Sequence, residues 1–244
     1  HANKLLLPHS FAEGADAVPV EICEGCAGRC AYCGTKNARG DLFSYPVQDI
    51  VKHVNELAKK GHIKILLTAQ DTGCYGLDIG STLPELLKKI SAIDGNFACR
   101  IGMMNPCYAA KYADEIIALM NEPNSKFLPF IHIPIQSGSD KVLKEMKRIG
   151  TAAEFKKTAE KFRKAVSGIT IATDIIVGFP TETDADFKKT VKLLKDAKPD
   201  VVNISMFYPR PNTAAAEMKQ LASQTVKKRS CELTKLCKAL KNNK

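Results

Sequence analysis

The residues best suited to chemistry are three cysteines in one short loop, Cys26, Cys30 and Cys33, spaced C-x3-C-x2-C. Thiolates ligate iron–sulfur clusters, and clusters that only carry electrons are commonly held by four cysteines. Three thiolates can ligate three irons of a 4Fe–4S cubane and leave the fourth iron without a protein ligand. The spacing therefore favours a cluster with one iron open to chemistry.

A fourth cysteine, Cys23, lies three positions before Cys26 and extends the pattern to C-x2-C-x3-C-x2-C. Four cysteines so close together also fit a closed zinc site or a four-ligand cluster. Side chains alternate along a strand, so we expect Cys23 on the same face as Glu21, ahead of the loop. No second pair of cysteines follows as in paired zinc knuckles. We interpret Cys23 as a neighbour of the cluster and keep the four-ligand site as the alternative.

Bulk composition is that of one globular domain in a reducing compartment. The chain has 244 residues, 45% hydrophobic content and nine cysteines. An odd number of cysteines that cluster in one loop favours metal binding over disulfides and predicts a cytoplasmic protein. No apolar run approaches the roughly 20 residues of a membrane span, and no signal peptide is visible, so we expect no membrane association.

Positive charge is concentrated near the end of the chain. The formal net charge is +10, and several lysines follow residue 226. A basic domain often binds polyanions such as nucleic acid, although a solvated polar helix face gives the same pattern. We expect residues 223–244 to form a basic amphipathic helix.

Strand and helix patterns alternate about six times along the chain. Hydrophobic periodicity predicts strands at residues 18–22, 63–68, 98–103, 127–135, 169–177 and 201–207, with helices between them. Such alternation predicts parallel strands with right-handed crossovers. Six units are fewer than the eight of a closed barrel, so we expect a partial, open α/β barrel over residues 18–222. The polar loops after the strands then meet at one rim, which includes the cysteine loop.

This arrangement resembles the radical S-adenosylmethionine (SAM) superfamily. Five further segments are similar to its methylthiotransferases: residues 38–40 (Ala-Arg-Gly), 132–139 (His-Ile-Pro-Ile-Gln-Ser-Gly-Ser), 146–148 (Met-Lys-Arg), 173–180 (Thr-Asp-Ile-Ile-Val-Gly-Phe-Pro) and 207–211 (Phe-Tyr-Pro-Arg-Pro). Residues 38–42, 44–46 and 67–73 most resemble the archaeal and eukaryotic branch, which modifies N6-threonylcarbamoyladenosine beside the tRNA anticodon. The alternatives are the ribosomal-protein branch and a zinc-stabilised RNA-binding module without catalysis.

The resemblance implies a set of cofactors and partners. Cys26, Cys30 and Cys33 would ligate a 4Fe–4S cluster whose fourth iron binds SAM for reductive cleavage. A second 4Fe–4S cluster is expected on an N-terminal domain, with residues 1–17 as the connector from it, and a TRAM domain is expected after residue 244. The expected partners are tRNA and a reductant protein. We expect the chain alone to cleave SAM without transferring methylthio groups.

The resemblance also implies roles for individual residues. Tyr32 would shield the cluster, and Gln70 would bind the amino group of SAM. The ribose hydroxyls or the carboxylate of SAM would be bound by Gln136, Ser137 and Ser139, and the carboxylate by Arg148. Adenine would pack on Ile176 and be read by the backbone of Phe207. We expect Arg39 and Arg210 to face RNA phosphates.

Overall fold

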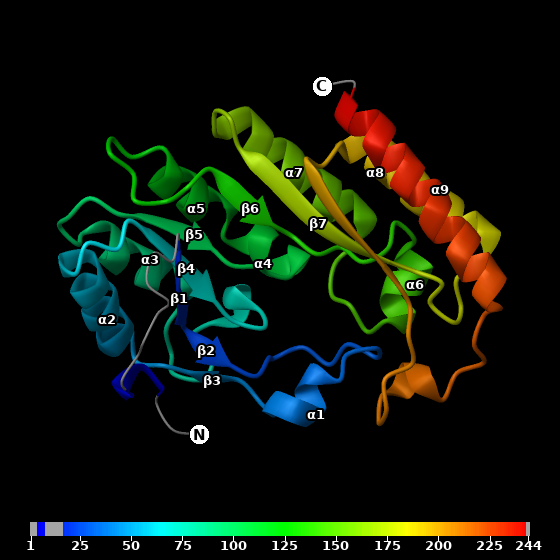
Figure 1. The fold of residues 1–244 in the computed structure, drawn as a ribbon, viewed down its shortest axis with the longest axis horizontal. Helices are drawn as coiled ribbons and strands as arrows, with labels where there is room; N and C mark the ends of the chain where they lie inside the picture. Colours follow the sequence, from blue (N-terminus) through cyan, green and yellow to red (C-terminus); the bar gives the residue numbers. More distant parts are fainter. Residues whose placement is uncertain (1–3, 8–16, 243–244) are drawn as a thin grey trace.

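Six parallel strands form two three-stranded sheets that follow one another in an open, curved arrangement in the computed structural model, which describes residues 4–7 and 17–242 (Figure 1). Strands pair in the orders β1-β4-β5 and β6-β7-β8, and a parallel bridge between Cys99 and Phe127 joins the two halves. The strands are β1 (Val18–Glu21), β4 (Lys64–Thr68), β5 (Ala98–Ile101), β6 (Phe130–His132), β7 (Thr170–Val177) and β8 (Val201–Met206). No pairing joins β1 to β8 among these residues, so the six-unit open barrel is confirmed.

Helices follow the strands and contact one another in the order α2, α3, α5, α7, α8, α9 around the sheet. The helices are α1 (Thr35–Arg39), α2 (Val47–Lys59), α3 (Leu83–Ser91), α4 (Pro106–Lys111), α5 (Ala113–Met120), α6 (Asp140–Glu145), α7 (Ala152–Ala165), α8 (Asp184–Ala197) and α9 (Ser223–Asn242). Short 3-10 turns are η1 (Lys4–Leu6), η2 (Thr72–Cys74) and η3 (Ala214–Ala216).

Local sequence explains where several helices begin. Three helices begin with a threonine whose hydroxyl accepts a hydrogen bond from the backbone N–H three residues later. The acidic side chain at that later position accepts one from the backbone N–H of the threonine. These threonines are Thr82, Thr151 and Thr183. This capping box satisfies two backbone donors that a helix start leaves unpaired. The segment between β5 and β6 holds two helices, because Tyr112 leaves helical geometry (φ −103°, ψ 11°) between α4 and α5.

The cysteine loop begins differently from the expected continuous strand. β1 ends at Glu21, and β2 (Cys23–Glu24) pairs antiparallel with β3 (Phe43–Ser44). Ile22 and Cys23 are both fully buried, so the alternation expected between them is absent. This small hairpin spans the base of the loop and was not predicted.

The C-terminal helix closes the fold beside β8 and α8 (Figure 1). Val226 and Leu233 of α9 are buried, and Arg229 pairs with buried Glu182 at 2.6 Å. No helix in the described part of the chain is long and apolar enough to cross a membrane. Most of the predicted connector, residues 1–3 and 8–16, lies outside the described residues.

Candidate metal centre and adjoining cavity

The three loop cysteines line one cavity at the rim of the sheet. Cys26, Cys30 and Cys33 are half-buried and free of disulfides, and all three border a cavity of about 270 Å³. A Cβ added to Gly28 would lie 3.3 Å from the Sγ of Cys26 and 4.0 Å from that of Cys30. Both sulfurs therefore converge on the same side of the loop.

The loop is held in place by backbone contacts with the opposite half of the sheet. Ala31 N donates to the carbonyl of Met146, and Ala215 N donates to the carbonyl of Ala31. Ala31 also belongs to a small apolar core with Met146, Phe179 and other side chains. Segments far apart in the sequence thus fix the cysteine loop at the carboxyl end of the strands.

Arg148 reaches into the cavity from the turn after α6. Its Nη1 atom lies 3.7 Å from the Sγ of Cys30, and its Nη2 atom donates to the carbonyl of Pro134. Its Nε atom is buried without a partner. The guanidinium therefore places a positive charge beside a cysteine of the motif, next to the space where a cluster would lie.

Asp71 and Cys74 lie behind Cys26, on the turn that follows β4. The ligand atoms of these three residues are all within 4.8 Å of one another. Burial raises the pKa of the Asp71 carboxyl to about 6. Hydrogen bonds donated by the backbone N–H groups of Asn105 and Gly73 lower this pKa but do not offset the effect of burial. Contact with Cys74, together with burial, raises the pKa of Cys26. Cys23 is fully buried, does not line the cavity, and has its Sγ 4.0 Å from the Asp71 carbonyl.

Buried polar atoms without partners surround the cavity. They are Gln70 Oε1, Asn105 Oδ1, Gln136 Oε1 and Arg148 Nε, and their residues all line it. Leaving a polar atom buried and unpaired costs about 1–3 kcal/mol, so this grouping indicates a site built for a polar ligand. Gln136 also has a left-handed φ of 74°, which is uncommon for a non-glycine residue.

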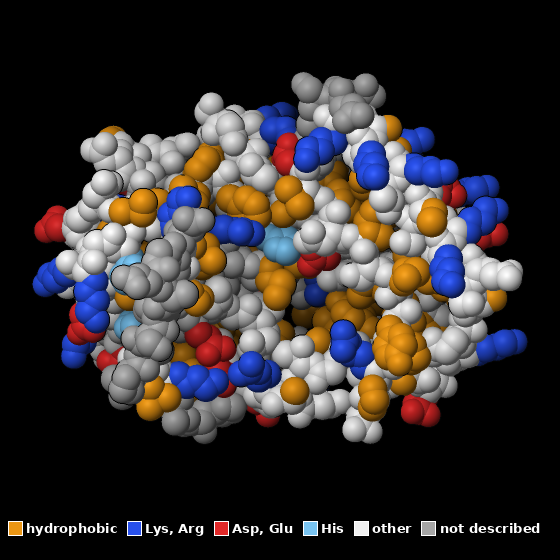
Figure 2. Space-filling model, in the orientation of Figure 1, with side chains coloured by type: hydrophobic (Ala, Val, Ile, Leu, Met, Phe, Trp, Pro, Cys, Tyr) orange, Lys and Arg blue, Asp and Glu red, His pale blue; other side chains and the backbone are white. Residues whose placement is uncertain are grey.

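A second cavity of about 730 Å³ adjoins the first and shares Tyr32, Cys33, Thr35, Gln136 and Asp174 with it. Ile176 and Phe207 border it, and Phe179 packs edge-on against Phe207 with ring centroids 5.5 Å apart. The predicted adenine contacts of Ile176 and Phe207 stay a prediction. Ligand sites of 300–1,000 Å³ commonly take drug-sized molecules. Figure 2 shows the molecule hollowed near the centre of this face.

Asp174 lies on β7 where the two cavities meet. Its Oδ1 atom accepts hydrogen bonds from His132 Nε2 at 2.9 Å and from Asn203 Nδ2 at 2.8 Å. Burial opposes ionisation, but these hydrogen bonds hold the pKa of Asp174 below its usual value. The carboxylate is therefore fixed and charged on the wall of the site.

Ser137 and Ser139 face away from both cavities. Ser139 Oγ donates to Asp186 on α8 at 2.7 Å, and Ser137 Oγ lies 3.4 Å from the hydroxyl of Thr190 on the same helix. Both serines are fully buried. Their described contacts secure the loop after β6 to α8, and a direct contact with SAM stays a prediction.

The two arginines predicted to face RNA have different surroundings. Arg210 is exposed, borders the larger cavity and packs its Cδ over Gly34. Arg39 has its Nη1 3.7 Å from the carboxylate of Glu24. Arg210 therefore lies at the mouth of the site, whereas Arg39 lies on α1 beside the small hairpin.

Sequence reasoning did not select Asp71, Cys74 or Asn105 as site residues. Each lies in a segment that follows a strand. Because loops after parallel strands meet at one edge of the sheet, this position in the sequence is the only indication that the residue lies near the site. The proximity of Cys74 to Cys26 depends on how two loops pack. No local pattern in the sequence carries that information.

The residues present fit a 4Fe–4S cluster with an open iron. Three free thiols border one cavity, a cationic side chain neighbours one of them, and unpaired polar atoms line the remaining wall. The reduction potential of a cluster is set in part by net charge and by hydrogen bonds to its sulfurs. Here Arg148 supplies a charge beside Cys30, and Gly28 N donates to the Sγ of Cys26. The donor set of the cavity therefore suits both a cluster and a polar molecule bound to it.

Comparison with known proteins agrees with this geometry. Residues 20–194 match the Radical SAM superfamily. A probable threonylcarbamoyladenosine tRNA methylthiotransferase from Archaeoglobus fulgidus is 44% identical over 235 residues, which are 95% of this chain and 55% of that protein. The threonylcarbamoyladenosine tRNA methylthiotransferase of Homo sapiens is 45% identical over 218 residues, 89% of this chain and 37% of that protein.

Solved structures share the fold. The radical SAM methyltransferase TsrM from Kitasatospora setae, solved with cobalamin and a [4Fe-4S] cluster, superposes with a TM-score of 0.66 at 16% identity, covering 82% of this chain and 38% of that one. Coproporphyrinogen III oxidase (HemN) from Escherichia coli gives a TM-score of 0.63 at 15% identity, covering 92% and 52%.

Proposed function

The chain belongs to the radical SAM superfamily, and on this premise we propose that it is the SAM-cleaving core of a tRNA methylthiotransferase. The proposed substrate is N6-threonylcarbamoyladenosine in tRNA. The observation that carries the proposal is 44–45% identity, over most of this chain, to proteins with that name from archaea and animals. The chain spans about half the length of the archaeal relatives it matches, so activity, substrate and partners are proposed for the whole protein.

The superfamily implies a 4Fe–4S cluster and SAM as cofactors. In this chain Cys26, Cys30 and Cys33 would hold three irons of that cluster. When bound, the cluster supplies an electron that cleaves SAM reductively. The cofactors carry this chemistry, and the protein binds them, orients them and excludes water.

Residues around the cavities supply those protein roles. Tyr32 and Phe207 form apolar walls that limit water at the reacting centre, and burial raises the pKa of Tyr32, which keeps its hydroxyl neutral. Gln70 and Gln136 offer buried amide oxygens, each able to accept a hydrogen bond from an ammonium or hydroxyl group. We assign Gln70 to the amino group of SAM, Gln136 to its ribose or carboxylate, and Ile176 to its adenine.

Arg148 and the two serines already have hydrogen-bond partners within the protein, which limits how they can contact SAM. Arg148 already donates to Pro134 and approaches Cys30, so it reaches a SAM carboxylate only through the donors that remain. Ser137 and Ser139 act, in our proposal, by fixing the loop that carries Gln136.

The remaining proposals concern partners. Arg210 at the cavity mouth and Arg39 on α1 are proposed to contact tRNA phosphates. A second 4Fe–4S cluster is proposed on a separate N-terminal domain, as the resemblance implies, and a reductant protein supplies electrons. We also propose a cytoplasmic location, as the cysteine usage predicts.

Nucleoside analysis tests the substrate assignment. Total tRNA from cells that lack the full-length gene is digested and measured by mass spectrometry beside tRNA from the complemented strain. We expect loss of the 2-methylthio derivative of N6-threonylcarbamoyladenosine and recovery on complementation. Retention of that nucleoside, together with loss of a methylthio group from a ribosomal protein, would assign the chain to the alternative branch.

A further inference from the structure

We propose that Cys26, Cys74 and Asp71 form a mononuclear site for a soft divalent metal ion, which is filled when the 4Fe–4S cluster is absent. Their ligand atoms lie within 4.8 Å of one another. Bond lengths of about 2.0–2.3 Å to a tetrahedral Zn²⁺ place ligand atoms roughly 3.3–3.8 Å apart. A small inward movement of the side chains therefore completes the site.

The three ligands are already oriented by hydrogen bonds. Asp71 Oδ1 accepts from Gly73 N at 3.0 Å and from Asn105 N at 3.1 Å. Cys26 Sγ accepts from Gly28 N at 3.2 Å, and the Cys74 thiol donates to the Asp71 carbonyl oxygen at 3.1 Å. The contacts to Asp71 and Cys26 fix the direction of these two ligands when a metal is bound, whereas Cys74 gives up its contact when the thiol loses its proton to the metal site.

Charge and access favour a cation at this position. Asp71 is buried and has no ion pair among the described residues, while the Arg148 guanidinium lines the same cavity and supplies positive charge in its surroundings. Buried charges are normally paired or bound to a metal. Two thiolates with one carboxylate suit Zn²⁺ or Fe²⁺ rather than Mg²⁺ or Ca²⁺. Cys26 and Asp71 border the cavity of about 270 Å³, which gives the ion an access route and a fourth position for water.

The site and the cluster exclude each other, because both use Cys26. A metal ion occupies Cys26, Cys74 and Asp71 only before the cluster is assembled or after it is lost. Zinc bound there blocks assembly until it is removed. This inference does not depend on the tRNA substrate and holds for any reaction that the cluster supports.

Cobalt titration of the reduced, cluster-free protein under anaerobic conditions tests the site. We expect one Co²⁺ per chain, an absorption band from thiolate-to-cobalt charge transfer, and displacement by Zn²⁺. Cys74→Ser and Asp71→Asn should each weaken binding by more than about tenfold. Cys33→Ser should bind normally, and so should Cys99→Ser, whose cysteine is buried on β5 away from the cavity.

Two results of the titration would overturn the proposal, and X-ray absorption provides a third test. One is Co²⁺ binding that survives Cys74→Ser but is lost in Cys33→Ser, which would place the ion in the cysteine motif. The other is no stoichiometric binding by the wild type. X-ray absorption of the zinc-loaded protein should show two sulfur neighbours, and three or more would contradict the assignment. Circular dichroism confirms that each variant is folded, and Asp71→Asn tests the site independently of the cysteines.

Discussion

The guanidinium of Arg148 lies beside the thiol of Cys30, with Nη1 3.7 Å from Sγ, although 118 residues separate the two in sequence. Arg148 is half-buried and is also anchored to the carbonyl of Pro134. Its charge is therefore fixed next to one ligand of the proposed cluster. A fixed positive charge at a cluster ligand favours the reduced, more negative form of the cluster.

Arg148→Gln should lower the reduction potential of the reconstituted cluster. We expect the ratio of reduced to oxidised cluster at a given potential to fall about tenfold, or 59 mV for a one-electron couple. An anaerobic redox titration followed by electron paramagnetic resonance measures the shift. Arg163→Gln on α7, where the guanidinium binds backbone carbonyls of 197 and 198, is the matched control. An unchanged midpoint in Arg148→Gln would refute the electrostatic role.

Removal of the Asp186 carboxylate should weaken the fold most at neutral pH. Asp186 accepts hydrogen bonds from Ser139 Oγ and Thr183 Oγ1, both at 2.7 Å, and these outweigh burial and hold its pKa below the ordinary 3.8. A depressed folded-state pKa contributes stability above pH 3.8 that is lost as pH falls through the folded-state value. Asp186→Asn should therefore lower Tm at pH 7 and flatten the acid limb of the Tm curve. Parallel curves for the two proteins would be inconsistent with this.

The buried ion pair between Arg229 and Glu182 should hold α9 on the core. The two side chains are 2.6 Å apart, and Glu182 also accepts from Gly178 N in the loop after β7. Breaking a buried pair leaves an uncompensated charge and typically costs about 3–5 kcal/mol. Arg229→Ala should reduce the free energy of unfolding in urea by that amount, and Lys228→Ala, on the exposed side, by less than about 0.5 kcal/mol. Equal effects would contradict this role.

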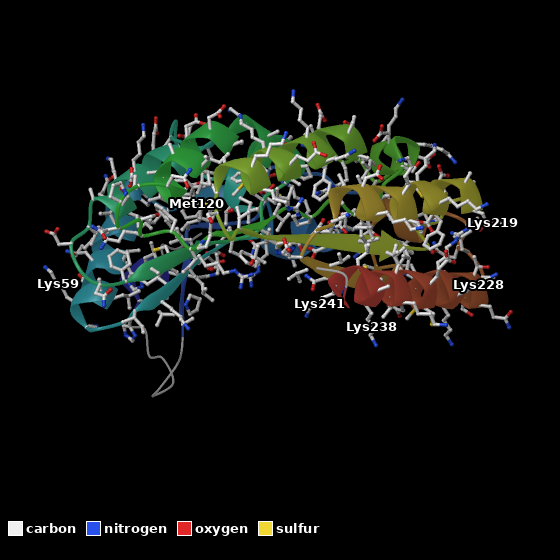
Figure 3. The ribbon with its side chains drawn as sticks, turned by 90° about the horizontal axis from the view of Figure 1, so that it is seen from above. Lys59, Met120, Lys219, Lys228, Lys238 and Lys241 are labelled. Carbon is white, nitrogen blue, oxygen red and sulfur yellow. The ribbon has the colours of Figure 1, made fainter. Side chains whose placement is uncertain are left out.

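Lysines on α9 and Arg210 should give salt-dependent tRNA affinity. Figure 3 shows Lys238 and Lys241 on α9, well apart from Lys59, which lies at the left end of the molecule. Loss of one phosphate contact lowers the slope of log K against log salt by about 1. We expect that reduction for Arg210→Ala and for Lys238→Ala, measured by fluorescence anisotropy of labelled tRNA. Lys59→Ala should not change the slope, and an equal change there would indicate nonspecific attraction.

The sequence predicted the parts of the site that depend on local pattern. Alternating strand and helix periods gave the open six-unit sheet, and the cysteine spacing placed Cys26, Cys30 and Cys33 on its rim. Both follow from short-range order, since loops after parallel strands meet at one edge. Gln136 was selected by resemblance, but its left-handed backbone has no signal in residue type.

Contacts between distant loops were beyond sequence reasoning. Ser139 was expected near SAM, but α8 supplies a carboxylate that binds its hydroxyl. Cys74 lies outside the cysteine motif, but packing of two rim loops brings it beside Cys26. Side-chain direction within a loop depends on such tertiary partners, which spacing alone does not define.

The central claim is that three cysteines, and not four, hold a cluster that cleaves SAM. The most direct measurement is formation of 5′-deoxyadenosine from SAM by the anaerobically reconstituted, reduced chain, with iron determined in parallel. We predict about four irons and product formation for the wild type and for Cys23→Ala, and loss of both in Cys26→Ala, Cys30→Ala and Cys33→Ala. Failure of the metal-free wild type to take up iron and form product, or equal loss of activity and iron in Cys23→Ala, would contradict the account.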